Sequence, residues 1–201
     1  MSKVLRDKDI RRALLQKLTE AYSSDSQTRI LQEFGLCEHS VRIDMAVVNG
    51  MMSGFEIKSD SDTLKRLPVQ QDIYSKIFDN VIVVVGEVHL DKIKDIVPEW
   101  WGIWIAQAVK GKVVLSVVRE SSYNPRVELK SIVKCLWKCE AIDIIKECGL
   151  YDKKLDRAKR AIIWDIAANG IPEIRLKELI RNSLKLRVDW RIVVRLASDG
   201  G

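Results

Sequence analysis

A single hairpin decides the fold of this chain, and its sequence is Ile43-Asp44-Met45-Ala46-Val47-Val48-Asn49-Gly50-Met51-Met52-Ser53-Gly54-Phe55-Glu56-Ile57-Lys58. Apolar and polar side chains alternate before Asn49-Gly50, which is the dipeptide most typical of a tight hairpin turn. A second run rich in β-forming residues follows it. The pattern predicts one strand over Val41–Val48 and another from about Met52 to Lys58.

The alternation also predicts the register of the two strands. If odd-numbered apolar residues of both strands share one face, the numbers of paired residues sum to an even value, and Asp44 can lie opposite Glu56. A strict two-residue turn gives an odd sum, so either the loop includes Met51 or a bulge near Gly54 corrects the register. Lys58 then lies on the same face as Glu56.

Two facing carboxylates repel each other unless a cation lies between them. Their hard oxygen atoms suit Mg²⁺ or Mn²⁺, and these ions keep waters that a substrate can displace. Lys58 would add a positive charge beside such a water. The alternative interpretation is a surface ladder of salt bridges on an edge hairpin.

The flanking sequence predicts helices on both sides of the hairpin. Asp7–Tyr22 has apolar residues at helical spacing, whereas Thr28–Phe34 is ambiguous between a short strand and a helix end. Ser59–Asp62 offers N-caps for a helix that carries Leu64 and Leu67, and Pro68 begins a new helix that lasts to Phe78.

The remaining strands precede a helical C-terminal part. Val81–Val85 is a continuous β-branched run typical of a strand buried on both faces, and further strands are expected around Gly102–Ala106 and Lys112–Val118. Pro125 opens a mainly helical remainder. The sequence therefore predicts an α/β domain over residues 1–121 with a mixed sheet, and a helical extension over 122–201, with a soft boundary that leaves one compact unit as an alternative.

This order, with Asp44 before a turn and then Phe55-Glu56-Ile57-Lys58, resembles the PD-(D/E)XK nuclease superfamily, whose core runs αβββαβ. Gln70 and Tyr74 reproduce the Gln-x-x-x-Tyr of its RecB-like branch. With residues 98–102 (Pro-Glu-Trp-Trp-Gly), the chain is similar to an uncharacterised bacterial and phage branch. The resemblance covers roughly residues 25–120.

The resemblance implies a role for each matching residue. Asp44, Glu56 and the backbone carbonyl of Ile57 would bind the metal, and Lys58 would position or activate the attacking water. Gln70 and Tyr74 would orient the lysine or the DNA backbone. Glu33 would be the first acidic residue of the family's pattern, with Glu20 as the other candidate. Ile43 stands where the family often has Pro.

Composition limits the setting in which such a site would work. The chain has 201 residues, is 47% hydrophobic and 31% charged, and carries a net charge of +6. Residues 151–201 hold 12 Lys and Arg against 7 Asp and Glu, which favours a polyanionic partner. The charged N-terminus and the absence of a long apolar run predict a cytoplasmic protein that does not enter membranes. We expect the four cysteines (Cys37, Cys135, Cys139 and Cys148) to be free thiols without zinc.

Several basic and aromatic residues are candidates for DNA contacts. Lys65 and Arg66 lie beyond the presumed site and either hold phosphates or form a solvated helix face. The helices Asp152–Ala168 and Pro172–Lys185 have helix-turn-helix spacing, with three basic residues on the second: Arg175, Arg181 and Lys185. Trp100, Trp101 and Trp104 either stack on bases or belong to the core.

The prediction from the sequence is thus a Mg²⁺- or Mn²⁺-dependent deoxyribonuclease of bacterial or phage DNA repair, recombination or defence. The alternatives are a non-catalytic DNA-binding module of the same fold and a protein-interaction subunit. DNA is the expected partner, and a homodimer is one of the oligomeric states left open.

Overall fold

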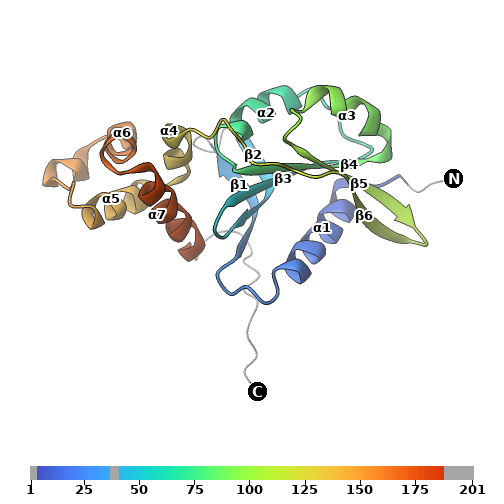
Figure 1. Ribbon diagram of the computed structural model, residues 1–201, viewed down its shortest axis with the longest axis horizontal. Coiled ribbons are helices and arrows are strands. Elements are labelled where there is room, and N and C mark those ends of the chain that lie inside the picture. Colours follow the sequence, from blue (N-terminus) through green and yellow to red (C-terminus); the bar gives the residue numbers. More distant parts are fainter. Residues whose placement is uncertain (1–3, 37–40, 188–201) are drawn as a thin grey trace, which may run out of the picture.

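A computed structural model describes residues 4–36 and 41–187 of the chain. It has an α/β fold with a six-stranded mixed sheet flanked by helices (Figure 1). The part that carries the predicted hairpin has the order α1 (Asp7–Ala21), β1 (Arg29–Leu36), β2 (Val41–Val48), β3 (Met52–Lys58), α2 (Leu67–Ser75) and β4 (Asn80–Gly86). A short 3-10 helix, Glu87–His89, then leads to α3 (Leu90–Ile96), β5 (Gly102–Val109) and β6 (Lys112–Arg119).

The strands lie in the sheet in chain order, from β1 to β6. β3, β4 and β5 are parallel, while the outer pairs β1–β2, β2–β3 and β5–β6 are antiparallel. The predicted register of the β2–β3 hairpin is confirmed, because Met45 pairs with Phe55 and Val48 with Met52. The loop is Asn49-Gly50-Met51, closed by the Asn49 amide donating to the Met51 carbonyl over 3.0 Å. Met51 therefore belongs to the loop, which was the first of the two solutions that the alternation allows.

Both faces of the sheet are covered. One face packs on α1 through a cluster that includes Ile10, Leu14, Met45, Phe55 and Val84. The other face lies beneath α2, α3 and the C-terminal helices. β4 has no residue from Val81 to Val85 more than 6% exposed, as the β-branched run predicts. The alternative interpretation of the hairpin as a surface ladder of salt bridges is wrong for Glu56 and Lys58, because side chains of α2 cover them and leave them 3% and 5% exposed.

The C-terminal part is helical, as predicted, and lies beside the β1–β3 side of the sheet (Figure 1). Its elements are α4 (Leu129–Ile132), a 3-10 turn at Val133–Cys135, α5 (Lys138–Glu147), a 3-10 helix at Lys153–Arg157, α6 (Arg160–Gly170) and α7 (Glu173–Leu186). One continuous apolar cluster contains residues of this part and of the sheet, among them Phe34, Ile132 and Leu184. The expected single helix over Asp152–Ala168 is wrong, because the backbone is extended at Ala158 and Lys159.

The helix predicted from the N-caps of Ser59–Asp62 is also absent from the structure. The same side chains close a turn instead. The Asp62 carboxylate accepts from the amide and hydroxyl of Ser59, at 2.8 and 2.6 Å, while Asp60 accepts from the Leu5 amide over 3.0 Å. Short polar side chains favour local bonds of this kind as readily as helix caps. Helix α2 begins only at Leu67, next to Pro68.

None of the helices in the described part of the chain is long and apolar enough to cross a bilayer. Cys135, Cys139 and Cys148 are free thiols. Cys37 and the nearby His39 lie outside the described residues. Of the three clustered tryptophans, Trp101 is fully buried, whereas Trp100 and Trp104 are partly buried against the two core clusters.

Candidate functional site: an acidic cleft across three strands

Three carboxylates come from the same level of three adjacent strands. The β1–β2 register pairs Gln32 with Met45 and Phe34 with Ile43, which sets Glu33 across from Asp44. The β2–β3 register, continued one step beyond the Met45–Phe55 pair, sets Asp44 across from Glu56. Glu33 has a left-handed backbone (φ 52°) within β1. Side chains of all three residues line one cleft.

Glu56 is the most buried of the three, and donors surround its carboxylate. Lys58 Nζ lies 2.6 Å and Gln70 Nε2 lies 2.7 Å from its Oε1. The Tyr74 hydroxyl lies 2.8 Å from Oε2 and 2.9 Å from the backbone carbonyl of Arg42. Gln70 Oε1 in turn accepts from Lys58 over 3.0 Å. Gln70 and Tyr74 share one face of α2 because they are one turn apart.

Asp44 is held by a backbone amide and by a cation from α1. Its Oδ2 accepts from the Ile57 amide over 2.7 Å, and its Oδ1 contacts the Arg11 guanidinium. Arg11 also contacts Glu33 Oε1 at 2.8 Å and Asp7 Oδ1 at 3.0 Å. One guanidinium thus contacts carboxylates from α1, β1 and β2, and its single positive charge balances only one of them.

These side chains border a cleft of about 570 Å³. Its lining includes five acidic and three basic side chains, namely Asp7, Glu33, Asp44, Glu56 and Asp62 with Arg42, Lys58 and Arg66. The cleft is therefore acidic although the chain as a whole is basic. A concave acidic surface with low-dielectric walls concentrates cations.

Burial and mutual repulsion raise the proton affinity of these carboxyl groups. Burial, and then the charge of Asp44, raise the pKa of Glu56 to about 7, although Lys58 opposes the shift. Burial likewise raises the pKa of Asp44 against the opposing effect of Arg11. Burial lowers the pKa of Arg11, but hydrogen bonds and charges from Asp7 and Asp44 outweigh it and raise that pKa above its ordinary value. The pKa of Tyr74 is raised by burial and by Glu56.

The structure brings most of the predicted site residues together. Arg11 contacts Glu33 and Asp44, while Lys58, Gln70 and Tyr74 surround Glu56, and the two groups are close enough for the charge of Asp44 to act on Glu56. Arg66 lines the cleft, while its neighbour Lys65 is exposed and does not line it. Glu20 does not line the cleft either. It accepts from Gln16 on the exposed side of α1.

Of the three basic residues of α7, Arg175 differs from the other two in its partners and in its position on the helix. Arg175 contacts Glu147 and Glu178, at 2.5 and 2.9 Å. Arg181 lies six positions further, which turns it about 120° away from Arg175 around the helix. Lys185 borders a separate hollow next to Thr28 and Arg29. Arg181 and Lys185 are one turn apart and share a side of α7, whereas Arg175 is paired with two glutamates.

Sequence reasoning missed four residues of the cleft: Asp7, Arg11, Arg42 and Asp62. A local signal existed for one pair, because Asp7 and Arg11 are spaced as an i,i+4 ion pair on a predicted helix. Nothing in the sequence indicated that Arg11 would reach β2, 33 positions away. In the described ranges, no three His, Cys, Asp or Glu side chains are already arranged around one metal position.

Comparison with known proteins gives a family. The model of the family described as Bacteriophage P4 protein cII matches residues 1–191. Protein cII of Enterobacteria phage P4 is 26% identical over 188 residues, which are 93% of this chain and 69% of that protein. A solved structure, the SPO1766 protein of unknown function from Silicibacter pomeroyi, is 18% identical with a TM-score of 0.37. It aligns with 52% of this chain and 64% of its own, so the chain spans less than two thirds of it, and a similarity of this extent carries no argument.

The family match overturns the prediction of a PD-(D/E)XK nuclease. The assignments as a metal-dependent deoxyribonuclease or phosphodiesterase, and to DNA repair, recombination or phage defence, are wrong. The motif residues have another physical explanation. Lys58 neutralises Glu56, Arg11 neutralises Asp44, and Gln70 and Tyr74 donate to Glu56. Buried charges need such partners whether or not they do chemistry, so the short pattern did not establish catalysis.

Proposed function

This chain belongs to the bacteriophage P4 protein cII family, and we propose that it binds a divalent cation in the acidic cleft and, through that cation, the phosphate backbone of DNA, without hydrolysing it. Mg²⁺ is the first candidate for the cation and Mn²⁺ the second.

The observation that carries the proposal is the convergence of Glu33, Asp44 and Glu56 at one level of three strands. Their carboxylate oxygens are the ligand type that Mg²⁺ prefers, and the three side chains, which do not yet surround one metal position, would have to close around the ion. The backbone of Ile57 faces the same position, since its amide donates to Asp44. Glu33, Asp44, Glu56 and the Ile57 backbone are therefore the groups proposed to hold the ion.

The placement of Arg11 indicates that the space between these carboxylates favours a positive charge. Its guanidinium already contacts three carboxylates of the cleft, those of Asp7, Glu33 and Asp44. A divalent ion would compete with Arg11 for these oxygens and would relieve the repulsion that remains between Asp44 and Glu56. Cation binding should therefore be modest in affinity and sensitive to Arg11.

The DNA part of the proposal rests on charge. An acidic cleft repels phosphate until a cation occupies it, so DNA binding at this site should require the ion. Arg42 and Arg66 line the cleft and Lys65 is exposed beside it, which supplies phosphate contacts around the ion. Arg181 and Lys185 on α7 remain a second, separate proposed contact.

The test compares conservative variants of Glu33 and Glu20, the two glutamates that were candidates for the first acidic residue of the site. Calorimetric titration and thermal melting would be carried out with Mg²⁺ and with Mn²⁺ on the wild type, Glu33→Gln and Glu20→Gln. Glu33 lines the cleft, whereas Glu20 lies outside it, and both side chains are exposed enough for the variants to fold. We expect the cation to raise the melting temperature of the wild type and of Glu20→Gln by similar amounts. The increase should be clearly smaller for Glu33→Gln, because an ion stabilises the folded protein only if the folded protein binds it.

Fluorescence anisotropy with labelled duplex DNA then tests the partner. Anisotropy should rise with protein only when the cation is present, and the recovered DNA should keep its full length. Equal cation responses of Glu33→Gln and Glu20→Gln would refute the site. DNA binding that ignores the cation would move the contact away from the cleft.

A further inference from the structure

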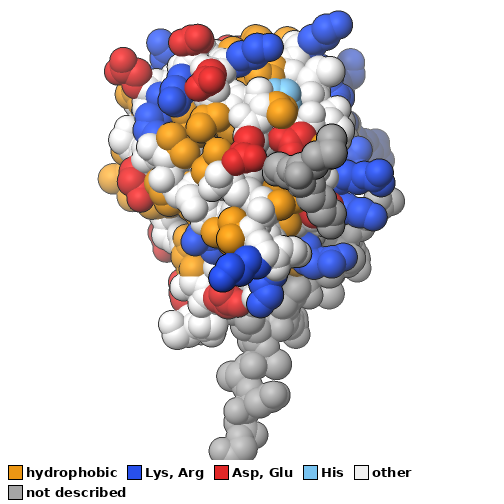
Figure 2. All heavy atoms as spheres, turned by 90° about the vertical axis from the view of Figure 1, so that its right-hand side faces the viewer, with side chains coloured by type: hydrophobic (Ala, Val, Ile, Leu, Met, Phe, Trp, Pro, Cys, Tyr) orange, Lys and Arg blue, Asp and Glu red, His pale blue; other side chains and the backbone are white. Residues whose placement is uncertain are grey.

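β6 forms one edge of the sheet, and it has no strand neighbour other than β5 in the described part of the chain. The β5–β6 hairpin extends beyond the helices that cover the sheet (Figure 1). Figure 2 faces this side of the molecule and shows hydrophobic side chains exposed among charged ones. Unpaired backbone groups along such an edge are a template for another strand.

β6 has a charged residue at each end, Lys112 and Arg119, and an irregular register near Val118, but the segment 113–117 between them is regularly paired with β5 and open to pairing on its other side. Residues 113–118 read Val-Val-Leu-Ser-Val-Val, without a charge or a proline, and Val114, Val117 and Val118 are 41–45% exposed. Edge strands of monomeric proteins usually carry charges, prolines or kinks that prevent association. Arg119 does not serve this purpose, because its guanidinium donates to the backbone carbonyls of Trp101 and Pro98, at 2.7 and 2.8 Å.

The opposite edge of the sheet is different. β1 has Arg29 and Glu33 within it, and Glu33 has a left-handed backbone. β1 also contacts the 3-10 turn at Val133–Cys135 of the C-terminal part. β6 also has charged ends and contacts α1, but it offers five successive uncharged residues, 113–117, in a regular register.

We propose that β6 pairs antiparallel with β6 of a second copy of this chain, around a twofold axis at Leu115. The two six-stranded sheets then form one continuous sheet. This inference is independent of the cation proposed for the cleft. It commits to a second copy because the edge is complementary to itself in backbone, in side chains and in charge.

The backbone register follows from the β5–β6 turn. Val109 and Lys112 flank the two-residue loop Lys110-Gly111, in which both residues have positive φ (48° and 80°). Residues that flank such a loop form a hydrogen-bonded pair, and these pairs alternate along the ladder. Val114 and Ser116 therefore bond toward β5, and the backbone groups of residues 113, 115 and 117 point outward.

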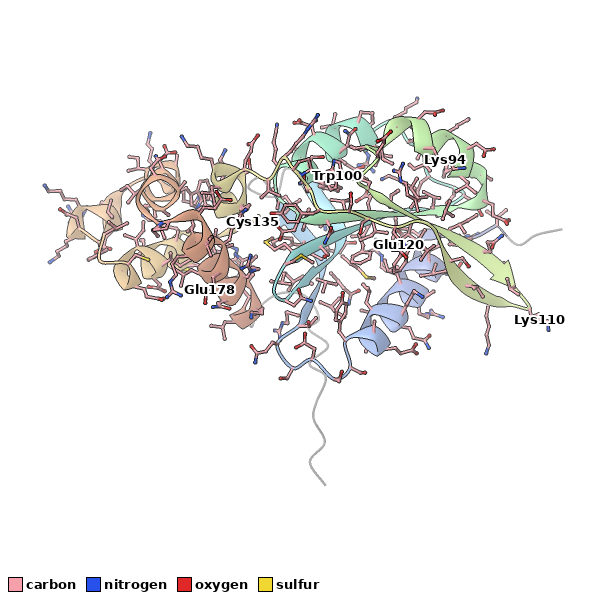
Figure 3. The ribbon with its side chains drawn as sticks, viewed as in Figure 1. Lys94, Trp100, Lys110, Glu120, Cys135 and Glu178 are labelled. Carbon is pink, nitrogen blue, oxygen red and sulfur yellow. The ribbon has the colours of Figure 1, made fainter. Side chains whose placement is uncertain are left out.

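The outward groups match only in certain registers. Two antiparallel strands form backbone hydrogen bonds where residues whose N–H and C=O point outward oppose each other. All three such residues of the segment 113–117 find a partner when the pairing is centred on Leu115. Val113 then opposes the second copy's Val117, and Val114 opposes the second copy's Ser116 in a close pair without backbone bonds. Lys110 and Glu120 lie at opposite ends of the hairpin (Figure 3), so antiparallel pairing brings each near the opposite charge of the other copy.

Analytical ultracentrifugation of the full chain over a concentration series tests the proposal. The wild type should sediment as a species of twice 23.0 kDa. Val114→Glu/Ser116→Glu should sediment as a monomer, because like charges then face each other in both close pairs. Val114→Lys/Ser116→Glu should remain a dimer, because the same register sets Lys against Glu. Val88→Glu, at a valine that is 61% exposed and off the edge, is the control and should also remain a dimer.

A second measurement does not depend on added charges. Leu115→Cys should crosslink to its own copy with oxidised glutathione, because a twofold axis at Leu115 sets the two Cα atoms at about the 5.5 Å of a disulfide. A monomeric wild type, or a Val114→Glu/Ser116→Glu dimer as stable as the wild type, overturns the proposal. Dissociation of Val114→Lys/Ser116→Glu together with an uncrosslinked Leu115→Cys overturns the proposed pairing around Leu115.

Discussion

Replacing Lys58 by Met should destabilise the fold by an amount that depends on pH. Lys58 and Glu56 are both buried, and the ion pair between them is 2.6 Å long. Removing one partner of a buried pair leaves the other charge uncompensated, which costs about 3–5 kcal/mol. Gln70 and Tyr74 still donate to Glu56 and keep the loss near the lower end of that range.

The pH dependence follows from the pKa of Glu56, which burial and Asp44 raise to about 7 from an ordinary 4.5. A raised carboxyl pKa means that the folded state holds a proton that the unfolded state has lost, so the free energy of unfolding falls as pH rises from 4.5 toward 7. In Lys58→Met the pKa rises further, because Lys58 lowers it in the wild type. The decline therefore continues above pH 7 in the variant, by up to about 1.4 kcal/mol per pH unit.

Urea denaturation without added cation, at about pH 5.5 and about pH 8.5, measures the effect. The stability deficit of Lys58→Met should be larger by about 2 kcal/mol at the higher pH, because a protonated Glu56 no longer needs the lysine. Lys76→Met is the control, since Lys76 forms a surface pair with Asp72, and its deficit should stay below about 0.5 kcal/mol at both pH values. A deficit that is equal at the two pH values, or larger in acid, would refute the assignment of the charge to Glu56.

Three further outcomes are expected. Arg11→Met should lower the stability of the cation-free protein and raise its Mg²⁺ affinity roughly tenfold by calorimetry, since the competing guanidinium is gone; unchanged affinity would mean that Arg11 does not occupy the cation's position. Gly86→Ala should cost about 1–3 kcal/mol in denaturant titrations, because its Cβ would lie 2.1 Å from Asp60 Oδ1, whereas Gly50→Ala, with open space around it, should be nearly neutral. Asn124→Ala should cost about 1–3 kcal/mol, because its buried amide donates to two backbone carbonyls at the end of α2; a neutral result would show that water replaces it.

The sequence by itself determined the hairpin and its register. Side chains of a strand alternate between its two faces, so a buried face limits which residues of the two strands can pair. The numbers of paired residues must add up to an even value, and this excludes a strict two-residue turn without a bulge. The uninterrupted Val81–Val85 run likewise determined a strand buried on both faces. The cluster of Asp44, Glu56 and Lys58 follows from the same local rule.

Only the tertiary structure decided what surrounds that cluster. Periodicity shows which face of an element is apolar but does not say which distant element covers it, because that depends on packing summed over the whole chain. Thus Arg11 reaches Asp44 across 33 positions, and α2 buries Glu56 and Lys58, which the sequence analysis had placed only on a common face of the strand. Whether a charged motif is a reactive site or a neutralised network depends on these neighbours, and so does the exposure of β6 as an unguarded edge.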